Sequence, residues 1–141
     1  MITKKCPSED VEQMAVVAEL KKRGIPFWHT NNELWTSSWK QKQRARDMGV
    51  QSGIPDLFVC FPEQLVGIEM KRKFGGTVSK NQKKWAYIIE QCNIPVWVAH
   101  GYEEAMEVVE KYEPLGKVKI PETPEPVRKA PKSRKKPEDI F

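Results

Sequence analysis

Asp56, Glu69 and Lys71 lie within the apolar runs of the stretch SGIPDLFVCFPEQLVGIEMKRKFGG, residues 52–76. Asp56 begins one apolar run, and Glu69 and Lys71 lie two residues apart in the next. Two carboxylates that lie close together repel each other unless a proton or a cation lies between them. A hard divalent metal such as Mg²⁺ meets that need at neutral pH, and a nearby lysine can orient water or stabilise charge on a phosphate. These residue types are therefore suited to hydrolysis of a phosphodiester.

The two apolar runs must pair as a hairpin for this chemistry to assemble. Side chains alternate across a strand, so Glu69 and Lys71 share one face while Met70 points the other way, into the core. A turn near residues 62–64 then brings Asp56 and Glu69 to the same end of the sheet, unless a one-residue slip turns a strand over. E-x-K alone is usually an ordinary ion pair on a solvated strand. The P-D pair, with Asp56 13 residues before Glu69, favours the catalytic interpretation.

The surrounding sequence predicts alternating helices and strands. Residues 7–24 are typical of a helix, with acids in the first turn and basic residues before a closing glycine. The continuous apolar run 94–99 favours a strand covered on both sheet faces. Further strands are predicted at 25–30, 56–61 and 65–71, and further helices near 38–48, at 79–92 and at 102–112. This order predicts an α/β fold with a central mixed β-sheet flanked by helices.

Composition divides the 141 residues into a domain at 1–112 and a flexible basic tail at 113–141. The tail holds 6 of the 11 prolines and few large apolar residues, so it cannot bury a core. Of the net charge of +5, the tail carries +3 (8 Lys/Arg, 5 Asp/Glu) and the rest +2 (16 and 14). No apolar run is long enough to span a membrane, and three cysteines without a CxxC pair fit the cytoplasm.

Five stretches in order, SEDVEQ, FWHTNNE, MGVQSGIPDLFV, GIEMKR and VSKNQKKW, span residues 8–85. With P-D…E-x-K, they resemble the VRR-NUC type of the PD-(D/E)xK nuclease superfamily, found in phage and bacterial nucleases. The resemblance implies a restriction-endonuclease-like core and Mg²⁺- or Mn²⁺-dependent cleavage of DNA. It further implies that Asp56 and Glu69 hold the metal, with the Met70 carbonyl as a third ligand, and that Lys71 positions the attacking water.

The family also places an acid on the first helix, where this sequence has Glu9 and Glu12. Glu9 continues a stripe at helical spacing through Gln13, Val16 and Leu20, whose apolar members should pack on the sheet. Glu12 lies about 60° off that line, at 100° per residue. Glu9 is therefore the favoured metal ligand, outer or direct, and the alternative is that it only caps its helix.

Two residues near the start of the helix at 79–92 are placed near the site by the same resemblance. Ser79 is the expected N-cap, and Gln82 can hydrogen-bond Lys71, water or a phosphate. The alternative for Gln82 is an ordinary surface position. Before Asp56, Gly53 is expected to allow a close backbone approach or a positive φ.

The segment around 28–48 is the expected DNA-facing surface. Its cations can contact phosphates, and Trp39, like Trp35, can stack on bases or wedge between them. For Trp39 the alternative is packing inward. The candidate DNA contacts, together with Ser79, are His29, Asn31, Trp39, Lys40, Arg44 and Arg46.

These observations favour a Mg²⁺-dependent DNA endonuclease that prefers branched, flap or junction DNA. One alternative is a module of the same fold that binds DNA without cutting it. Another is a Holliday-junction resolvase, which would act as a homodimer with two sites facing one junction.

Overall fold

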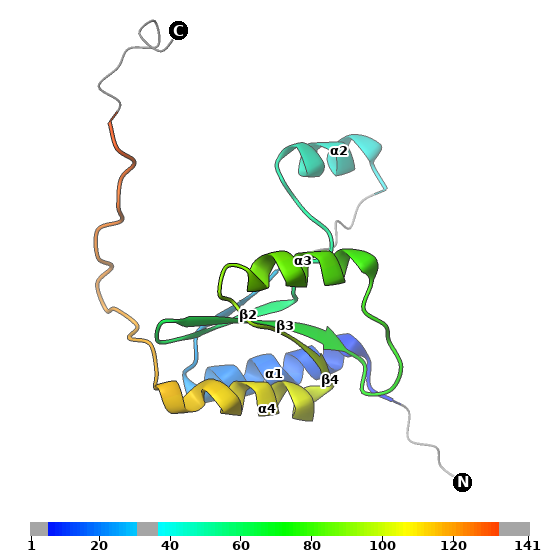
Figure 1. The fold of residues 1–141 in the computed structure, drawn as a ribbon, viewed down its shortest axis with the longest axis horizontal. Coiled ribbons are helices and arrows are strands. Elements are labelled where there is room, and N and C mark those ends of the chain that lie inside the picture. The colour runs from blue at the N-terminus through cyan, green and yellow to red at the C-terminus, as the bar shows by residue number, and fades with distance from the viewer. Residues whose placement is uncertain (1–5, 31–36, 133–141) are drawn as a thin grey trace, which may run out of the picture.

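The computed structural model describes residues 6–30 and 37–132 of the chain (Figure 1). Its elements follow the predicted order, and they are α1 (Glu9–Arg23), β1 (Phe27–His29), α2 (Trp39–Asp47), β2 (Leu57–Phe61), β3 (Gln64–Lys71), α3 (Lys80–Glu90), β4 (Val96–His100), α4 (Tyr102–Tyr112) and the short 3₁₀ helix η1 (Glu113–Leu115). The predicted α/β architecture is confirmed.

The described strands form one mixed sheet in the order β1-β2-β3-β4. β1, β2 and β3 are antiparallel neighbours, and β4 runs parallel to β3. A two-residue turn, Pro62-Glu63, joins β2 to β3, and Glu63 adopts a positive φ of 59°. Leu57 consequently pairs with Ile68, and this register sets which residues of the two strands lie opposite each other.

The main core lies between the sheet and the helices α1 and α4, which cover one face (Figure 1). Fully buried side chains of α1 meet those of α4 and the inward positions of β2, β3 and β4. These include Val16, Leu20, Leu57, Val59, Val66, Ile68, Met70, Ala99, Ala105 and Val109. The interior positions of Val16 and Leu20 confirm that the predicted stripe of α1 packs on the sheet.

The opposite face of the sheet is covered more lightly. α3 lies across it, yet none of its residues is buried, and α2 stands farther out on the same side (Figure 1). Trp97 and Val98 of β4 remain 36% and 41% exposed. The prediction that both faces of this strand are covered is therefore wrong, because β4 lies at the edge of the sheet.

The described chain continues beyond α4 through η1, where Glu113 forms an ion pair with Arg23 of α1. From residue 117 to 132 it has no helix or strand. Ile120 still lines a shallow pocket with Gly24 and Ile25, and the rest of the segment runs away from the domain (Figure 1). Residues 133–141 of the predicted tail lie outside the described part. No helix among the described residues is long and apolar enough to cross a membrane.

Gly53 fixes the loop that enters β2 against the start of α3. Its φ is +90°, and a Cβ placed on it would lie 2.7 Å from the backbone carbon of Asn81. The side-chain amide of Asn81 also donates to Ser52 Oγ at 2.8 Å. Both conformational properties predicted for Gly53 are therefore present, and they tie the segment before Asp56 to α3.

We predict that Gly53→Ala lowers the free energy of unfolding by about 2–3 kcal/mol, because strain at positive φ adds to a collision with backbone. Gly49→Ala is the matched control: Gly49 has a φ of +94°, but a Cβ added to it would meet nothing within 4 Å. Urea unfolding measures both variants. If both variants lost the same free energy of unfolding, the close approach of Gly53 to Asn81 would contribute nothing to stability.

Candidate active site

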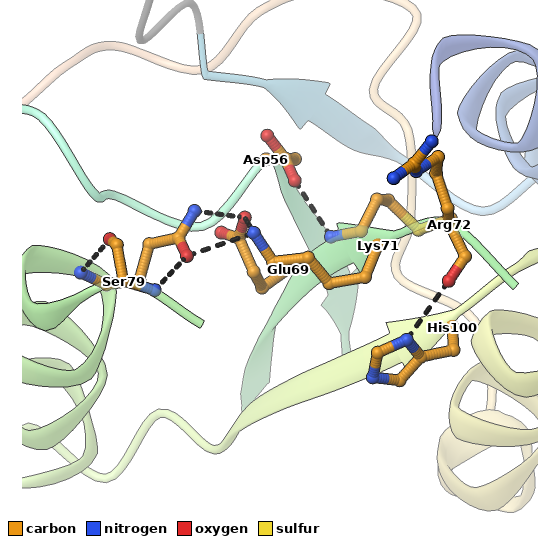
Figure 2. Close-up of polar contacts among 8 residues, drawn as sticks. Asp56, Glu69, Lys71, Arg72, Ser79 and His100 are labelled. Atoms are coloured by element: carbon orange, nitrogen blue, oxygen red, sulfur yellow. Dashed lines mark hydrogen bonds and ion pairs between the residues drawn. The ribbon is translucent and has the colours of Figure 1, made fainter. Parts of the chain in front are cut away.

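β3 carries Glu69 and Lys71 on the face of the sheet opposite the main core, and both side chains are almost wholly buried (Figure 2). The Lys71 ammonium lies 3.7 Å from Glu69 Oε1. A solvated ion pair would leave both groups in water, whereas here only 5% of Glu69 and 8% of Lys71 are exposed. The interpretation as an ordinary surface pair is therefore excluded.

Asp56 precedes β2 and lies opposite Glu69, because its neighbour Leu57 pairs with Ile68. Its Oδ2 accepts a hydrogen bond from the Met70 backbone N–H at 2.8 Å (Figure 2). Its carbonyl oxygen accepts from the Thr30 N–H and lies 2.8 Å from His29 Nδ1. Hydrogen bonds from both neighbouring segments thus fix Asp56 beside Glu69, as the hairpin required.

Gln82 joins the acid to the lysine. Its Oε1 accepts from Lys71 Nζ at 3.0 Å, while its Nε2 donates to Glu69 Oε1 at 2.8 Å. The same Oε1 accepts from the Ser79 backbone N–H at 2.8 Å, and Ser79 Oγ accepts from the Gln82 N–H at 3.1 Å (Figure 2). This capping box fixes the Gln82 side chain while it starts α3, so Gln82 is not an ordinary surface residue.

Burial of the acid pair makes a second negative charge costly. Burial, followed by repulsion from Asp56, raises the pKa of Glu69 to about 8, and Lys71 only partly offsets this. Burial also raises the pKa of Asp56, although the hydrogen bond from Met70 opposes that shift. Without a further cation between them, the two carboxyl groups therefore favour retaining one proton.

The carboxylate oxygens of Asp56 and Glu69 also fit a divalent metal. Carboxylate oxygens are the ligands that Mg²⁺ prefers, and a cation between Asp56 and Glu69 would replace their shared proton. Within the described ranges, no three His, Cys, Asp or Glu side chains gather closely enough to hold a metal. Mg²⁺ does not need such a cage, because it usually binds one or two carboxylates together with water and substrate phosphates.

The two acids of α1 have different surroundings. Glu12 is 8% exposed, and its Oε2 accepts from the Tyr102 backbone N–H at 2.7 Å, so it caps the start of α4. Glu9 lies within electrostatic range of the site: burial and then repulsion from Asp56 raise its pKa, while Lys71 lowers it. Ser8, rather than Glu9, caps α1. The charges of Asp56 and Lys71 therefore act on Glu9, and its support of a metal stays a prediction.

Arg72 is a charged neighbour that the sequence interpretation missed. Its carbonyl oxygen lies 3.0 Å from His100 Nδ1, and its side chain points toward α1 (Figure 2). Its positive charge lowers the pKa of Glu9. The run Lys71-Arg72-Lys73 was the available signal, but only the fold shows that consecutive side chains of this run face different elements.

The residues predicted to contact DNA are not gathered in one place. His29 lies beside Asp56, and its Nδ1 is also 3.1 Å from Gln13 Nε2. Trp39 is 70% exposed on α2, so the alternative of inward packing is wrong. Lys40, Arg44 and Arg46 lie on the same helix, in which no residue is buried. Asn31 and Trp35 lie outside the described residues.

The family model for the VRR-NUC domain matches residues 8–103, which include every catalytic candidate above. The chain belongs to the VRR-NUC family. A solved structure named "VRR_NUC domain protein" shares its fold, with a TM-score of 0.68 and 21% identity over 81% of this chain and 94% of that one. The chain has no match among curated proteins. VRR-NUC is a nuclease-type domain, which suggests DNA nuclease activity for this chain.

We predict opposite consequences for the two acids of α1. Glu12→Ala leaves the Tyr102 N–H without its acceptor and should cost about 1–3 kcal/mol of folding stability. Glu9→Ala should change stability by less than about 1 kcal/mol, since its charge is unfavourable there, yet lower cleavage or metal affinity about 10–100-fold. Urea unfolding and single-turnover cleavage measure both. A stable Glu12→Ala protein with impaired cleavage would reverse the assignment.

Proposed function

We propose that this VRR-NUC protein is a Mg²⁺-dependent DNA endonuclease, with Mn²⁺ as a substitute, that prefers branched, flap or junction DNA. One observation carries the proposal: the buried Glu69 lies beside the half-buried Asp56, and both acids lie near a buried lysine that Gln82 holds in place. Burial of such charges costs stability, so a purely structural role would be expensive. The combination fits a centre that acts on a phosphodiester.

The role proposed for each residue combines its contacts with the family resemblance. Asp56 and Glu69 would hold the metal, with the Met70 carbonyl as a further ligand and Glu9 as outer support. When bound, the metal supplies a Lewis acid that neutralises charge on the scissile phosphate. Lys71 would orient the attacking water and stabilise negative charge that develops on the phosphate. Gln82 would hold the Lys71 ammonium in place for contact with the phosphate through the 3.0 Å hydrogen bond.

DNA binding would draw on the cations around the centre. The chain carries a net charge of +5, and basic side chains that contact phosphates fix a protein on DNA without reading its sequence. α2 presents Lys40, Arg44 and Arg46 on an exposed helix beside Trp39. Phosphate contacts by these cations would add to those of Ser79 and His29 at the centre itself.

We predict that Lys71→Ala lowers the rate of DNA cleavage about 10²–10³-fold, because charge stabilisation at the phosphate is lost. Lys111→Ala is the matched control: Lys111 lies in the last turn of α4, at the end of the helix away from the site, and should leave the rate unchanged. The assay uses single-stranded, duplex, flap and four-way DNA with Mg²⁺, Mn²⁺ or EDTA. Full activity of the Lys71→Ala protein would contradict the mechanism.

The same assay separates the alternatives. Binding of branched DNA without cleavage in any metal would indicate a binding module. Cleavage of four-way DNA by a protein that light scattering shows to be dimeric would indicate a junction resolvase.

A further inference from the structure

The connection between β3 and α3 presents an aromatic side chain close to Lys71. Phe74, three residues after Lys71, is 70% exposed. Single exposed apolar residues are common on protein surfaces and need no explanation by themselves. What distinguishes Phe74 is the way that its loop is held against the candidate active site.

The first residues of this loop are fixed to the end of β4. The Lys71 carbonyl accepts from the Gly101 N–H at 3.0 Å, and the Arg72 carbonyl lies 3.0 Å from His100 Nδ1 (Figure 2). Gly75 and Gly76 then both adopt positive φ, at 80° and 79°.

The two glycines turn the loop back toward the catalytic lysine. A Cβ on Gly76 would lie 3.6 Å from both Cβ and Cδ of Lys71, which is ordinary van der Waals contact. The loop therefore leaves Lys71 and comes back to it at Gly76. Phe74 lies between the residues bonded to β4 and the two glycines. Phe74 therefore lies on a short loop whose return contacts the candidate catalytic lysine, and its ring is open to solvent.

The charges around Phe74 indicate what kind of molecule its ring would meet. Lys73 Nζ lies 5.9 Å from the centre of the Phe74 ring. Arg72 and Lys73 are exposed, and within the described part of the chain neither forms an ion pair. An exposed apolar ring beside Lys73, on a loop that also carries the exposed Arg72, complements a polyanion that carries flat apolar groups, which describes a nucleic acid strand.

Base pairing decides which part of a strand the ring can reach. In an intact duplex both faces of each base are covered by neighbouring bases. An aromatic side chain stacks most easily on a base that is unpaired or displaced from the duplex, because a wedge between paired bases must first unstack them.

We propose that Phe74 stacks on an unpaired nucleobase next to the scissile phosphate, while Arg72 and Lys73 contact the flanking phosphates. This inference rests on the proposed nuclease function and adds a residue that selects DNA with interrupted base pairing. The stacked base would hold its own phosphate beside Lys71.

Binding experiments without catalysis test the stacking directly. The probe is flap DNA with 2-aminopurine as the unpaired base next to the junction, added to the full chain in EDTA, because stacking quenches the fluorescence of this base. The wild-type protein and Phe74→Tyr, which keeps the ring, should quench it. Phe74→Ala should not. Tyr87→Ala removes an aromatic ring of equal exposure, 71%, from α3 and should behave as wild type.

Single-turnover cleavage of the same flap DNA in Mg²⁺ supplies the second measurement. Phe74→Ala should cleave on the order of tenfold more slowly, as loss of one base-stacking contact predicts, while Phe74→Tyr keeps the wild-type rate. Wild-type protein that binds without quenching, or Phe74→Ala protein that quenches and cleaves normally, would overturn the proposal.

Failure of the nuclease assignment would look different. The wild-type protein would then cleave no DNA in any metal, whereas the fluorescence assay would still report stacking. Absence of binding in EDTA together with absence of cleavage in every metal would overturn both.

Discussion

The active-site region depends on one electrostatic constraint: the buried Glu69 lies beside the half-buried Asp56, and Lys71 offsets only part of the repulsion between the two carboxylates. Their proximity follows from the register of β2 and β3, which the two-residue turn Pro62-Glu63 sets. A slip of one residue would turn Glu69 and Lys71 into the core and Met70 out of it. The apolar face of β3 resists this slip, because Met70 is fully buried against α1 and α4.

The surrounding structure holds the pair from several directions. Gly53 lets the loop before Asp56 approach α3, and the capping box of α3 fixes Gln82 against Glu69 and Lys71. On the other side, Glu12 caps α4 directly after β4, the strand that pairs with β3. Helix starts and a tight glycine contact, rather than a large apolar layer, thus position the polar side chains on the lightly covered face.

The alternation of side chains along strands and the local pattern at the start of α3 made much of the site predictable from the sequence. The period of two in β3 placed Glu69 and Lys71 on one face, and the spacing of Ser79 and Gln82 is that of a capping box. Long-range contacts were not predictable in this way. The hydrogen bond from Tyr102 to Glu12 joins residues 90 positions apart, so the helical stripe alone favoured Glu9 without revealing what Glu12 does. The exposure of Trp97 and Val98 depends on strand order, which an apolar run does not encode.

Proton release on metal binding tests the central constraint most directly. Because the pKa of Glu69 is raised to about 8, the folded protein at pH 7 holds a proton that a divalent cation must displace. Calorimetric titration with Mg²⁺ in two buffers of different ionisation enthalpy should therefore show about one proton released per metal at pH 7. At about pH 9, above the pKa, release should be nearly absent, and Glu69→Gln should abolish it at both pH values. Mg²⁺ binding at pH 7 without proton release, or no difference between wild type and Glu69→Gln, would contradict the account.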